Sequence, residues 1–162
     1  MLAARLIEAG VHFVTVRLRP AEFDFDTHLD NFSRLRALLP PFDKGLATLI
    51  DRLKERGLFK ETAIMVAGEF GRTPKINSQG GRDHWARAMF ALMAGGDVEG
   101  GQVIGETDDR AGAPIGKGYS PDDLAASFFQ NIGINSKHEF QTNVGRPINL
   151  VRDGKPISQL FS

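Results

Sequence analysis

Two short apolar runs constrain the fold of this chain more than any other feature of the sequence. One covers residues 63–67, and the other covers residues 88–94 and is followed by two glycines. Apolar runs of this length, when turn residues bound them, are typical of buried strands, although a buried helical segment shows the same pattern. We therefore predict core strands over Thr62–Ala67 and Ala88–Ala94.

Helical and strand patterns alternate along the rest of the chain. The helical patterns cover Leu2–Ala9, Phe42–Arg56 and a segment with Ser120 as the N-cap and Gly133 beyond its end. The expected apolar face of this last helix consists of Leu124, Ala125, Phe128, Phe129 and Ile132. The remaining strand patterns cover Val11–Arg17, Gln102–Ile104 and part of the tail from Gln141 to Ser162. Helices that alternate with strands favour a mostly parallel α/β sheet. At 162 residues, we expect a single domain over residues 1–162.

The charge balance argues against two classes of partner. The chain carries 20 basic and 20 acidic residues, so its formal net charge is zero. A surface of this kind has no net field that would gather nucleic acid or an acidic membrane. No segment approaches the roughly 18 consecutive apolar residues that a membrane span requires. We therefore expect a soluble chain with neither nucleic acid nor a membrane as its partner.

Polar loops follow two of the predicted strands, and each loop carries potential metal ligands. The loop over residues 20–31 carries them at alternate positions: Asp24, Asp26, His28 and Asp30. The segment over residues 69–85 carries Glu69, Asp83 and His84. Because ligands bind at the carboxyl ends of strands in open α/β sheets, we expect the two groups to meet along one edge.

The chemistry of these side chains suits a metal. The chain has no cysteine, so any metal must be bound by His, Asp and Glu. Carboxylates combined with imidazoles suit Zn²⁺, Mn²⁺ or iron better than calcium, and such sites support metal-assisted hydrolysis. The alternative is a solvated loop in which Asp30 caps a short helix, since turns and N-caps also collect aspartate.

Two arginines flank the second group of ligands. The guanidinium of Arg72 or Arg82 would bind a phosphate or sulfate through two hydrogen bonds. The alternative is that each arginine forms a structural ion pair with Glu69 or Asp83.

Small and hydroxyl residues of the same region add less. Three glycines permit a close approach of the backbone but form no phosphate-binding motif: Gly71, Gly80 and Gly81. Three hydroxyls are candidate nucleophiles, and none has an obvious base beside it in sequence: Thr27, Thr73 and Ser78. Because His12 falls on the same side of its predicted strand as Val14 and Val16, we expect a buried, hydrogen-bonded histidine.

Three motifs occur in a fixed order along the chain. They are Asp26-Thr27-His28, then Glu69 to Pro74, and then Gly81 to Trp85. Together they resemble an uncharacterised family, domain of unknown function 1501, within the alkaline phosphatase-like superfamily. The segments 53–72 and 120–134 also resemble the helix–strand region and the late capped helix of sulfatases and related phosphatases.

The resemblance implies a fold, an activity and a site. The fold would be a three-layer α/β/α arrangement with a partial alkaline phosphatase-like core, and the activity would be metal-dependent hydrolysis of a small phosphate or sulfate ester. A divalent metal, zinc or manganese, would be bound by Asp26, His28, Glu69, Asp83 and His84, and Arg72 or Arg82 would bind the anion. Glu69 and Phe70 stand where the superfamily usually has aspartate followed by histidine, so His84 would supply the missing imidazole.

The resemblance covers the C-terminal portion of longer proteins, which often begin with a twin-arginine export signal. It therefore implies an exported, periplasmic protein whose nucleophile lies outside this chain, so that the chain alone is inactive. The alternative is a non-catalytic module with a degenerate metal site that binds a partner or holds the fold together. In that module Glu69 would pair with Arg72 or Arg82, and Asp83 would cap a helix. A sheet cut from a larger fold would expose an edge or an apolar face, which a second copy of the chain would cover.

Overall fold

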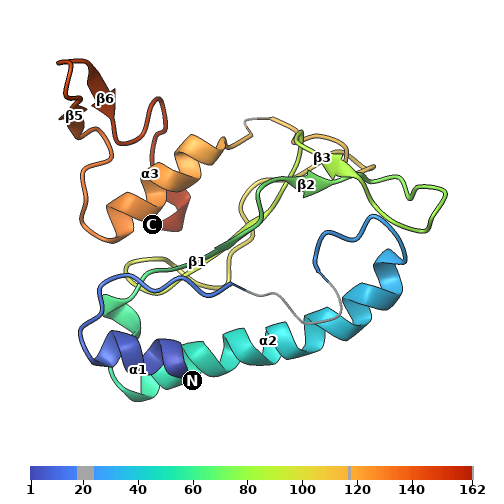
Figure 1. Cartoon of the computed structure of the whole chain (residues 1–162), viewed down its shortest axis with the longest axis horizontal. Helices are drawn as coiled ribbons and strands as arrows, with labels where there is room; N and C mark the ends of the chain where they lie inside the picture. Colours follow the sequence, from blue (N-terminus) through green and yellow to red (C-terminus); the bar gives the residue numbers. More distant parts are fainter. Residues whose placement is uncertain (18–23, 117, 162) are drawn as a thin grey trace. The chain divides into compact units, whose positions relative to one another are not determined.

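The computed structural model describes residues 1–17, 24–116 and 118–161. Its α-helices are α1 (Leu2–Glu8), α2 (Asn31–Glu55) and α3 (Pro121–Asn131), and its 3₁₀ turns are η1 (Phe59–Glu61) and η2 (Ser158–Leu160). Its strands are β1 (Ile64–Ala67), β2 (Gly71–Arg72), β3 (His84–Trp85), β4 (Ala91–Ala94), β5 (Glu139–Gln141) and β6 (Pro147–Asn149) (Figure 1). This mixture of helices and strands confirms the α/β class. Part of the predicted polar loop, residues 20–23, lies outside the described residues.

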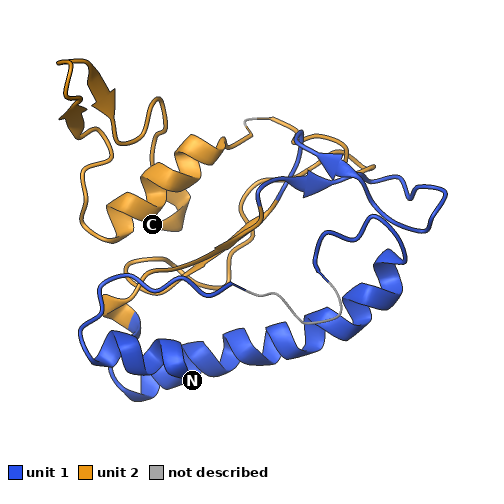
Figure 2. Ribbon diagram, in the orientation of Figure 1, with its two compact units in different colours: residues 1–59, 69–89 blue, residues 60–68, 90–162 orange. Residues whose placement is uncertain are grey.

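The chain divides into two compact units, which Figure 2 shows in different colours. The first unit consists of residues 1–59 and 69–89, and it contains α1, α2, β2 and β3. The second unit consists of residues 60–68 and 90–162, and it contains β1, β4, α3, β5 and β6. The single domain that we expect over residues 1–162 stays a prediction. No helix in the described ranges is both long enough and apolar enough to span a membrane.

The described strands form three antiparallel pairs, so the prediction of a mostly parallel sheet is wrong for this part of the chain. The pairs are β1 with β4, β2 with β3, and β5 with β6. Parallel neighbours need a crossover connection, which is usually a helix. Residues 68–90 connect β1 to β4 through the β2–β3 ribbon instead of a helix, so β4 returns beside β1 in the opposite direction.

The two strands predicted from the apolar runs are present, but they are shorter and less buried than we expected. β1 alternates between half-buried and exposed residues along its length. Met65 on β1 is 42% exposed and Leu92 on β4 is 43% exposed. Because Met65 pairs with Met93 while Leu92 pairs with Val66, the two exposed side chains lie on opposite faces. Neither face of this strand pair is therefore fully buried, whereas the sequence pattern indicated burial on both faces.

α2 begins well before Phe42, where the sequence predicted its start. The helix contains Pro40 and Pro41, and an internal proline costs about 3 kcal/mol because it removes a hydrogen bond and clashes with the preceding turn. Tertiary contacts compensate on both sides of the prolines. Leu38 and Leu53 are both buried, and the backbone N–H of Asn31 donates to Gly80 O at 3.0 Å.

α3 confirms the sequence prediction for its cap. The Ser120 hydroxyl accepts from the backbone N–H of Asp123 at 3.1 Å, and the Asp123 carboxylate accepts from the N–H of Ser120 at 2.9 Å. The buried positions are Ala126 and Ser127, which differ from the apolar face that we expected. Ile132 on that expected face is 41% exposed.

Three local predictions are wrong. The described residues 11–17 form neither a helix nor a strand, and His12 is exposed instead of buried in a core. Residues 102–104 also form no strand, and Val103 is 96% exposed. Each segment has β-branched residues but lacks a neighbouring described strand that would bury one face, and strand propensity depends on that burial.

Candidate metal centre

The two predicted groups of ligands meet within the first unit, through backbone contacts between residues 27–31 and 79–82. Leu29 and Gly80 form an isolated antiparallel bridge. The N–H of Asp30 donates to Gln79 O at 3.2 Å, and the N–H of Arg82 donates to Thr27 O at 3.0 Å. These bonds place the segment that carries His28 against the segment that carries Asp83 and His84.

Gly81 allows this close approach, and Gly71 allows a second one nearby, as the sequence indicated. A Cβ atom on Gly81 would overlap the backbone carbonyl of His28. A Cβ atom on Gly71 would overlap the backbone carbonyl of Ala88. Gly71 pairs with Trp85 in the β2–β3 ribbon, where Arg72 pairs with His84.

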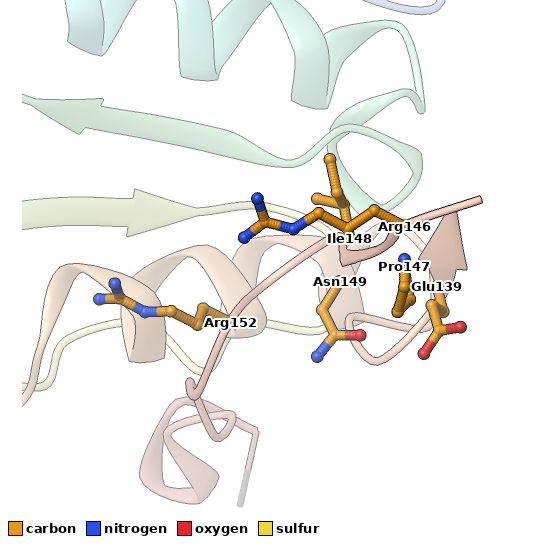
Figure 3. A pocket seen from close by; sticks show the side chains of 6 residues that line it. All are labelled: Glu139, Arg146, Pro147, Ile148, Asn149 and Arg152. Carbon is orange, nitrogen blue, oxygen red and sulfur yellow. The ribbon is translucent and has the colours of Figure 1, made fainter. Parts of the chain in front are cut away.

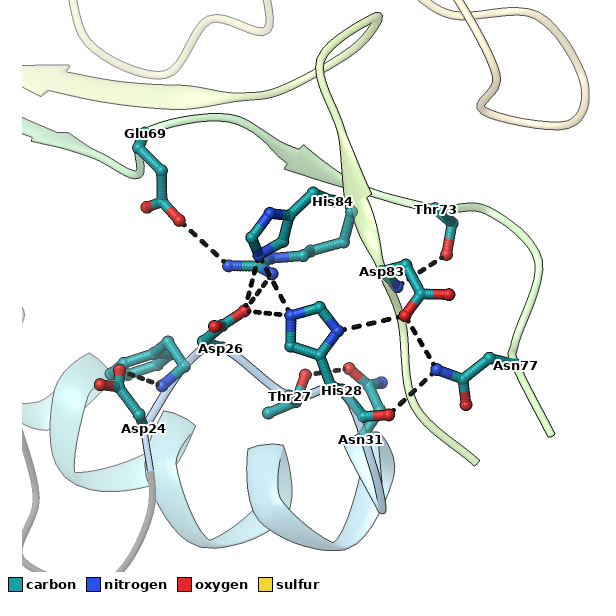
Figure 4. A network of polar contacts seen from close by, with 12 residues as sticks. Asp24, Asp26, Thr27, His28, Asn31, Glu69, Thr73, Asn77, Asp83 and His84 are labelled. Atoms are coloured by element: carbon teal, nitrogen blue, oxygen red, sulfur yellow. Dashed lines mark hydrogen bonds and ion pairs between the residues drawn. The ribbon is translucent and has the colours of Figure 1, made fainter. Parts of the chain in front are cut away.

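Three ligand atoms from two segments converge at one point, as Figure 4 shows. Asp26 Oδ1 lies 3.0 Å from His28 Nε2 and 3.2 Å from His84 Nε2, and the two Nε2 atoms lie 3.1 Å apart. In a tetrahedral zinc site with bonds near 2.0–2.1 Å, neighbouring ligand atoms are about 3.3 Å apart. The three side chains therefore form a group that could hold a metal ion.

Glu69 lies outside this group of three and contacts Arg72. The guanidinium of Arg72 donates to Glu69 Oε1 at 3.2 Å and also to Asp26 Oδ1. The Arg72 side chain is only 21% exposed, whereas Glu69 is 61% exposed. The ion pair between Glu69 and Arg72 matches our alternative for these residues, and metal binding by Glu69 stays a prediction.

Asp83 contacts the opposite side of the His28 ring from Asp26. Its Oδ1 atom lies 3.1 Å from His28 Nδ1 (Figure 4). The alternative in which Asp83 caps a helix is wrong, because Asp83 directly precedes the strand β3.

Arg82 holds its own loop in place. Its Nη1 atom donates to the carbonyl oxygens of Thr73 at 2.6 Å and Pro74 at 2.7 Å. The guanidinium also lies 5.9 Å from the centre of the Phe32 ring. These contacts are structural, and anion binding by Arg82 stays a prediction.

Both aspartates near His28 have lowered pKa values. Partial burial raises the pKa of Asp26, but hydrogen bonds from His84 and Arg72 together with the charge of Arg72 outweigh that effect and lower it. The pKa of Asp83 is lowered chiefly by the hydrogen bond with His28 and then by the one from Asn77. The site therefore keeps two carboxylates ionised at neutral pH, as a cation site requires.

Asn77 is a residue of the site that the sequence analysis missed. Its Nδ2 atom donates to His28 O at 3.0 Å and to Asp83 Oδ1 at 3.1 Å. Its Oδ1 atom accepts from the N–H groups of Gln79 and Gly81, each at 2.9 Å. The signal was an asparagine three residues before a pair of glycines, since asparagine side chains often bond the backbone of a turn in this way.

The other predicted residues serve local structure. Asp24 Oδ1 accepts from its neighbour's N–H at 2.7 Å. Asp30 occupies the N-cap position of α2, as our alternative expected, but its side chain makes no capping hydrogen bond within the described part of the chain. The Thr27 hydroxyl is buried and donates to Asn31 Oδ1 at 2.6 Å, and the Thr73 hydroxyl donates to Lys75 O at 2.8 Å.

A shallow hollow of about 350 Å³ on the second unit is separate in sequence from these residues. It is lined by Glu139, Arg146, Pro147, Ile148, Asn149 and Arg152 (Figure 3). None of the residues that line it belongs to the predicted metal or anion site.

Comparisons with known proteins identify the family. The comparison with curated proteins and the comparison with solved structures each gave no match. The family model described as protein of unknown function (DUF1501) matches residues 1–161. Because this match covers nearly all of its 162 residues, the chain belongs to the DUF1501 family.

Proposed function

We propose that Asp26, His28 and His84 bind a divalent metal, zinc or manganese, in the site of a phosphate or sulfate ester hydrolase. The observation that carries this proposal is the triangle of one carboxylate oxygen and two imidazole nitrogens with sides of 3.0, 3.1 and 3.2 Å. Catalytic zinc sites typically have three protein ligands and keep one position open for water or substrate.

The exposure of the three side chains fits such an open site. Asp26, His28 and His84 are 46%, 41% and 50% exposed, so an ion and a small ester can reach them from solvent. A structural metal site would instead be closed by a fourth protein ligand. Glu69 stays a candidate for an additional ligand, although its carboxylate contacts Arg72.

The chain's own residues define what the site would contribute to hydrolysis. A divalent metal would supply Lewis-acid polarisation of a phosphoryl or sulfuryl oxygen. Arg72 holds a positive charge beside Asp26 and would stabilise the anionic ester. The hydroxyls of Thr27 and Thr73 donate to Asn31 and to Lys75 O, and Ser78 lies exposed in a turn. We propose that the nucleophile comes from outside this chain, in an exported protein with a three-layer core.

Metal analysis and calorimetry test the proposal. We expect the purified protein to bind one Zn²⁺ or Mn²⁺ ion per chain, and His84→Ala to abolish that binding. The matched control is Asp108→Asn, which changes a carboxylate whose partners lie in its own turn and should leave the stoichiometry unchanged. A protein that binds neither ion would refute the metal site.

Hydrolysis is tested separately. A longer family member that contains this segment together with a nucleophile should hydrolyse p-nitrophenyl phosphate or sulfate, and its counterpart of His84→Ala should not. Metal binding without hydrolysis of either ester would refute the enzymatic part of the proposal. It would favour the non-catalytic module, which the ion pairs of Arg72 with Asp26 and Glu69 also support.

A further inference from the structure

The two nitrogens of His28 have different partners. Nδ1 lies 3.1 Å from Asp83 Oδ1, and Nε2 lies 3.0 Å from Asp26 Oδ1. Figure 4 shows Asp83 and Asp26 on opposite sides of the His28 ring. Asp83 Oδ1 therefore lies on the far side of the His28 ring from the three converging ligand atoms.

We propose that Asp83 is a positioning residue and not a metal ligand: it fixes the proton of His28 on Nδ1, so that the Nε2 lone pair faces Asp26 and His84. This inference rests on the proposed metal site. It assigns Asp83 a different role from the direct coordination that the family resemblance implied.

Both nitrogens of His28 face a carboxylate oxygen, and the other partners of those oxygens favour a proton on Nδ1. Asp26 Oδ1 already accepts from the guanidinium of Arg72, whereas the side chain of Asn77, which donates to Asp83 Oδ1, is neutral, so Asp83 is the stronger acceptor for the His28 proton. An ionised carboxylate can only accept hydrogen bonds, so its contact with Nδ1 is favourable when Nδ1 carries the proton. A neutral imidazole has one N–H, so Nε2 is then unprotonated. Its lone pair lies 3.0 Å from Asp26 Oδ1, and this repulsive contact is relieved by a proton on His84 Nε2, 3.1 Å away, or by a cation bound among the three atoms. The arrangement is therefore suited to a cation, and histidine ligands of metals usually donate their other N–H to a carboxylate or carbonyl.

Asp83 is held in place without any help from a metal. Asn77 Nδ2 donates to the same Oδ1 atom at 3.1 Å and to His28 O at 3.0 Å. The backbone N–H of Asp83 donates to the Thr73 hydroxyl at 3.1 Å, and its carbonyl accepts from the N–H of Thr73 at 2.8 Å. The side chain of Asn77 therefore holds both the Asp83 carboxylate and the backbone of His28, the residue that Asp83 orients.

Nuclear magnetic resonance of the metal-free protein at about pH 8 reads the tautomer directly, because a free histidine is neutral there. The chain has four histidines, so the His28 signal is assigned by its loss in His28→Gln. We expect the wild-type ring to be protonated on Nδ1 and Asp83→Ala to shift the population toward the Nε2–H form. Asp83→Asn keeps an acceptor oxygen and should retain the Nδ1–H form.

Zinc affinity supplies the second measurement. Removing a carboxylate that orients a histidine ligand typically lowers metal affinity about 10–100-fold, so Asp83→Ala should weaken zinc binding by that factor at an unchanged stoichiometry. Asp108→Ala, which removes a carboxylate from a separate turn, should change neither the tautomer nor the affinity.

The outcomes separate this inference from the proposed function. If the wild type binds no zinc, the metal site is refuted while the tautomer measurement still tests the role of Asp83. An unchanged tautomer in Asp83→Ala would overturn the inference even if zinc binds, and so would a His28 ring protonated on both nitrogens in the wild type. Loss of one ion from the stoichiometry in Asp83→Ala would instead identify Asp83 as a direct ligand.

Discussion

Asp83 in the first unit and Asp108 in the second both have a lowered pKa, but for different reasons. Asp108 Oδ1 accepts from the backbone N–H groups of Gly112 at 2.7 Å and Arg110 at 3.1 Å, and the bond from Gly112 is the main cause of its lowered pKa. Asp83 Oδ1 instead contacts the side chains of His28, 55 positions away in sequence, and Asn77.

This difference separates a structural carboxylate from one that belongs to a site. The bonds of Asp108 close a single turn, which also contains the bridge between Thr107 and Pro114. The bonds of Asp83 join two loops and leave an imidazole nitrogen directed at other polar atoms. A lowered pKa alone would not distinguish the two residues, whereas the sequence separation and chemistry of their partners do.

The largest effect should come from removing the close approach that joins the two loops. In Gly81→Ala the new Cβ would overlap the backbone carbonyl of His28, so the loops must separate. We expect a loss of about 1–3 kcal/mol in the free energy of unfolding, the usual cost of forcing extra atoms into a packed region. Fluorescence of Trp85, the only tryptophan, follows unfolding of the first unit in urea.

The matched variant in the turn is Gly112→Ala. Its Cβ would lie 3.2 Å from Asp108 Oδ2, the end of a side chain that can move. We expect a smaller loss, measured by circular dichroism of the same protein. Equal losses in the two variants would contradict the difference that we draw between the loops.

A smaller effect should follow from Asn77→Ala, which removes the side chain that links His28 to Asp83. The substitution leaves the Asp83 oxygen and the His28 carbonyl without one donor each, and a lost hydrogen bond of this kind typically costs about 1–3 kcal/mol when the group stays buried. Since Asp83 is exposed, we expect a smaller loss than this in urea unfolding, together with weaker zinc binding. Asn77→Asp keeps the Oδ1 bonds to the turn but loses the donor, so it should weaken zinc binding without changing the turn.

Local patterns explain which parts of the fold the sequence predicted. The cap of α3 depends on Ser120 and Asp123, three residues apart, and its bonds can be anticipated from their order alone. β1 follows from a short apolar run. The direction of β4 relative to β1 depends on the segment that connects them, and the start of α2 depends on the hydrogen bond from the Asn31 N–H to Gly80 O. Neither can be predicted from a local sequence pattern.

The meeting of the two groups of ligands was predicted, but for the wrong reason. We expected two parallel strands to bring them to one sheet edge, and the described residues 11–17 form no strand. The bridge between Leu29 and Gly80 and the small size of Gly81 bring them together instead. The chemistry of Asp26, His28 and His84 could be read from residue types, whereas the role of Asp83 depends on which nitrogen of His28 it faces.

The smallest expected effect is a difference in acid stability. A carboxylate with a lowered folded-state pKa contributes stability above its unfolded value of 3.8, and that stability is lost as the pH falls through the folded-state pKa. Asp108→Asn should therefore lower the melting temperature of the metal-free protein slightly at neutral pH. The difference from wild type should vanish in acid, where Asp108 is protonated.

The background variant His28→Gln sharpens this measurement, because it removes the main cause of the lowered pKa of Asp83 and none of the partners of Asp108. The contribution of Asp83 to the pH dependence of the melting temperature is the difference between protein with and without Asp83→Asn. This contribution should be smaller in the His28→Gln background. The contribution of Asp108 to the pH dependence of the melting temperature should be the same with His28 and with His28→Gln, because the donors to Asp108 are backbone N–H groups of its own turn. If His28→Gln reduced both dependences equally, the partners of Asp108 would not be local in the way that its hydrogen bonds indicate.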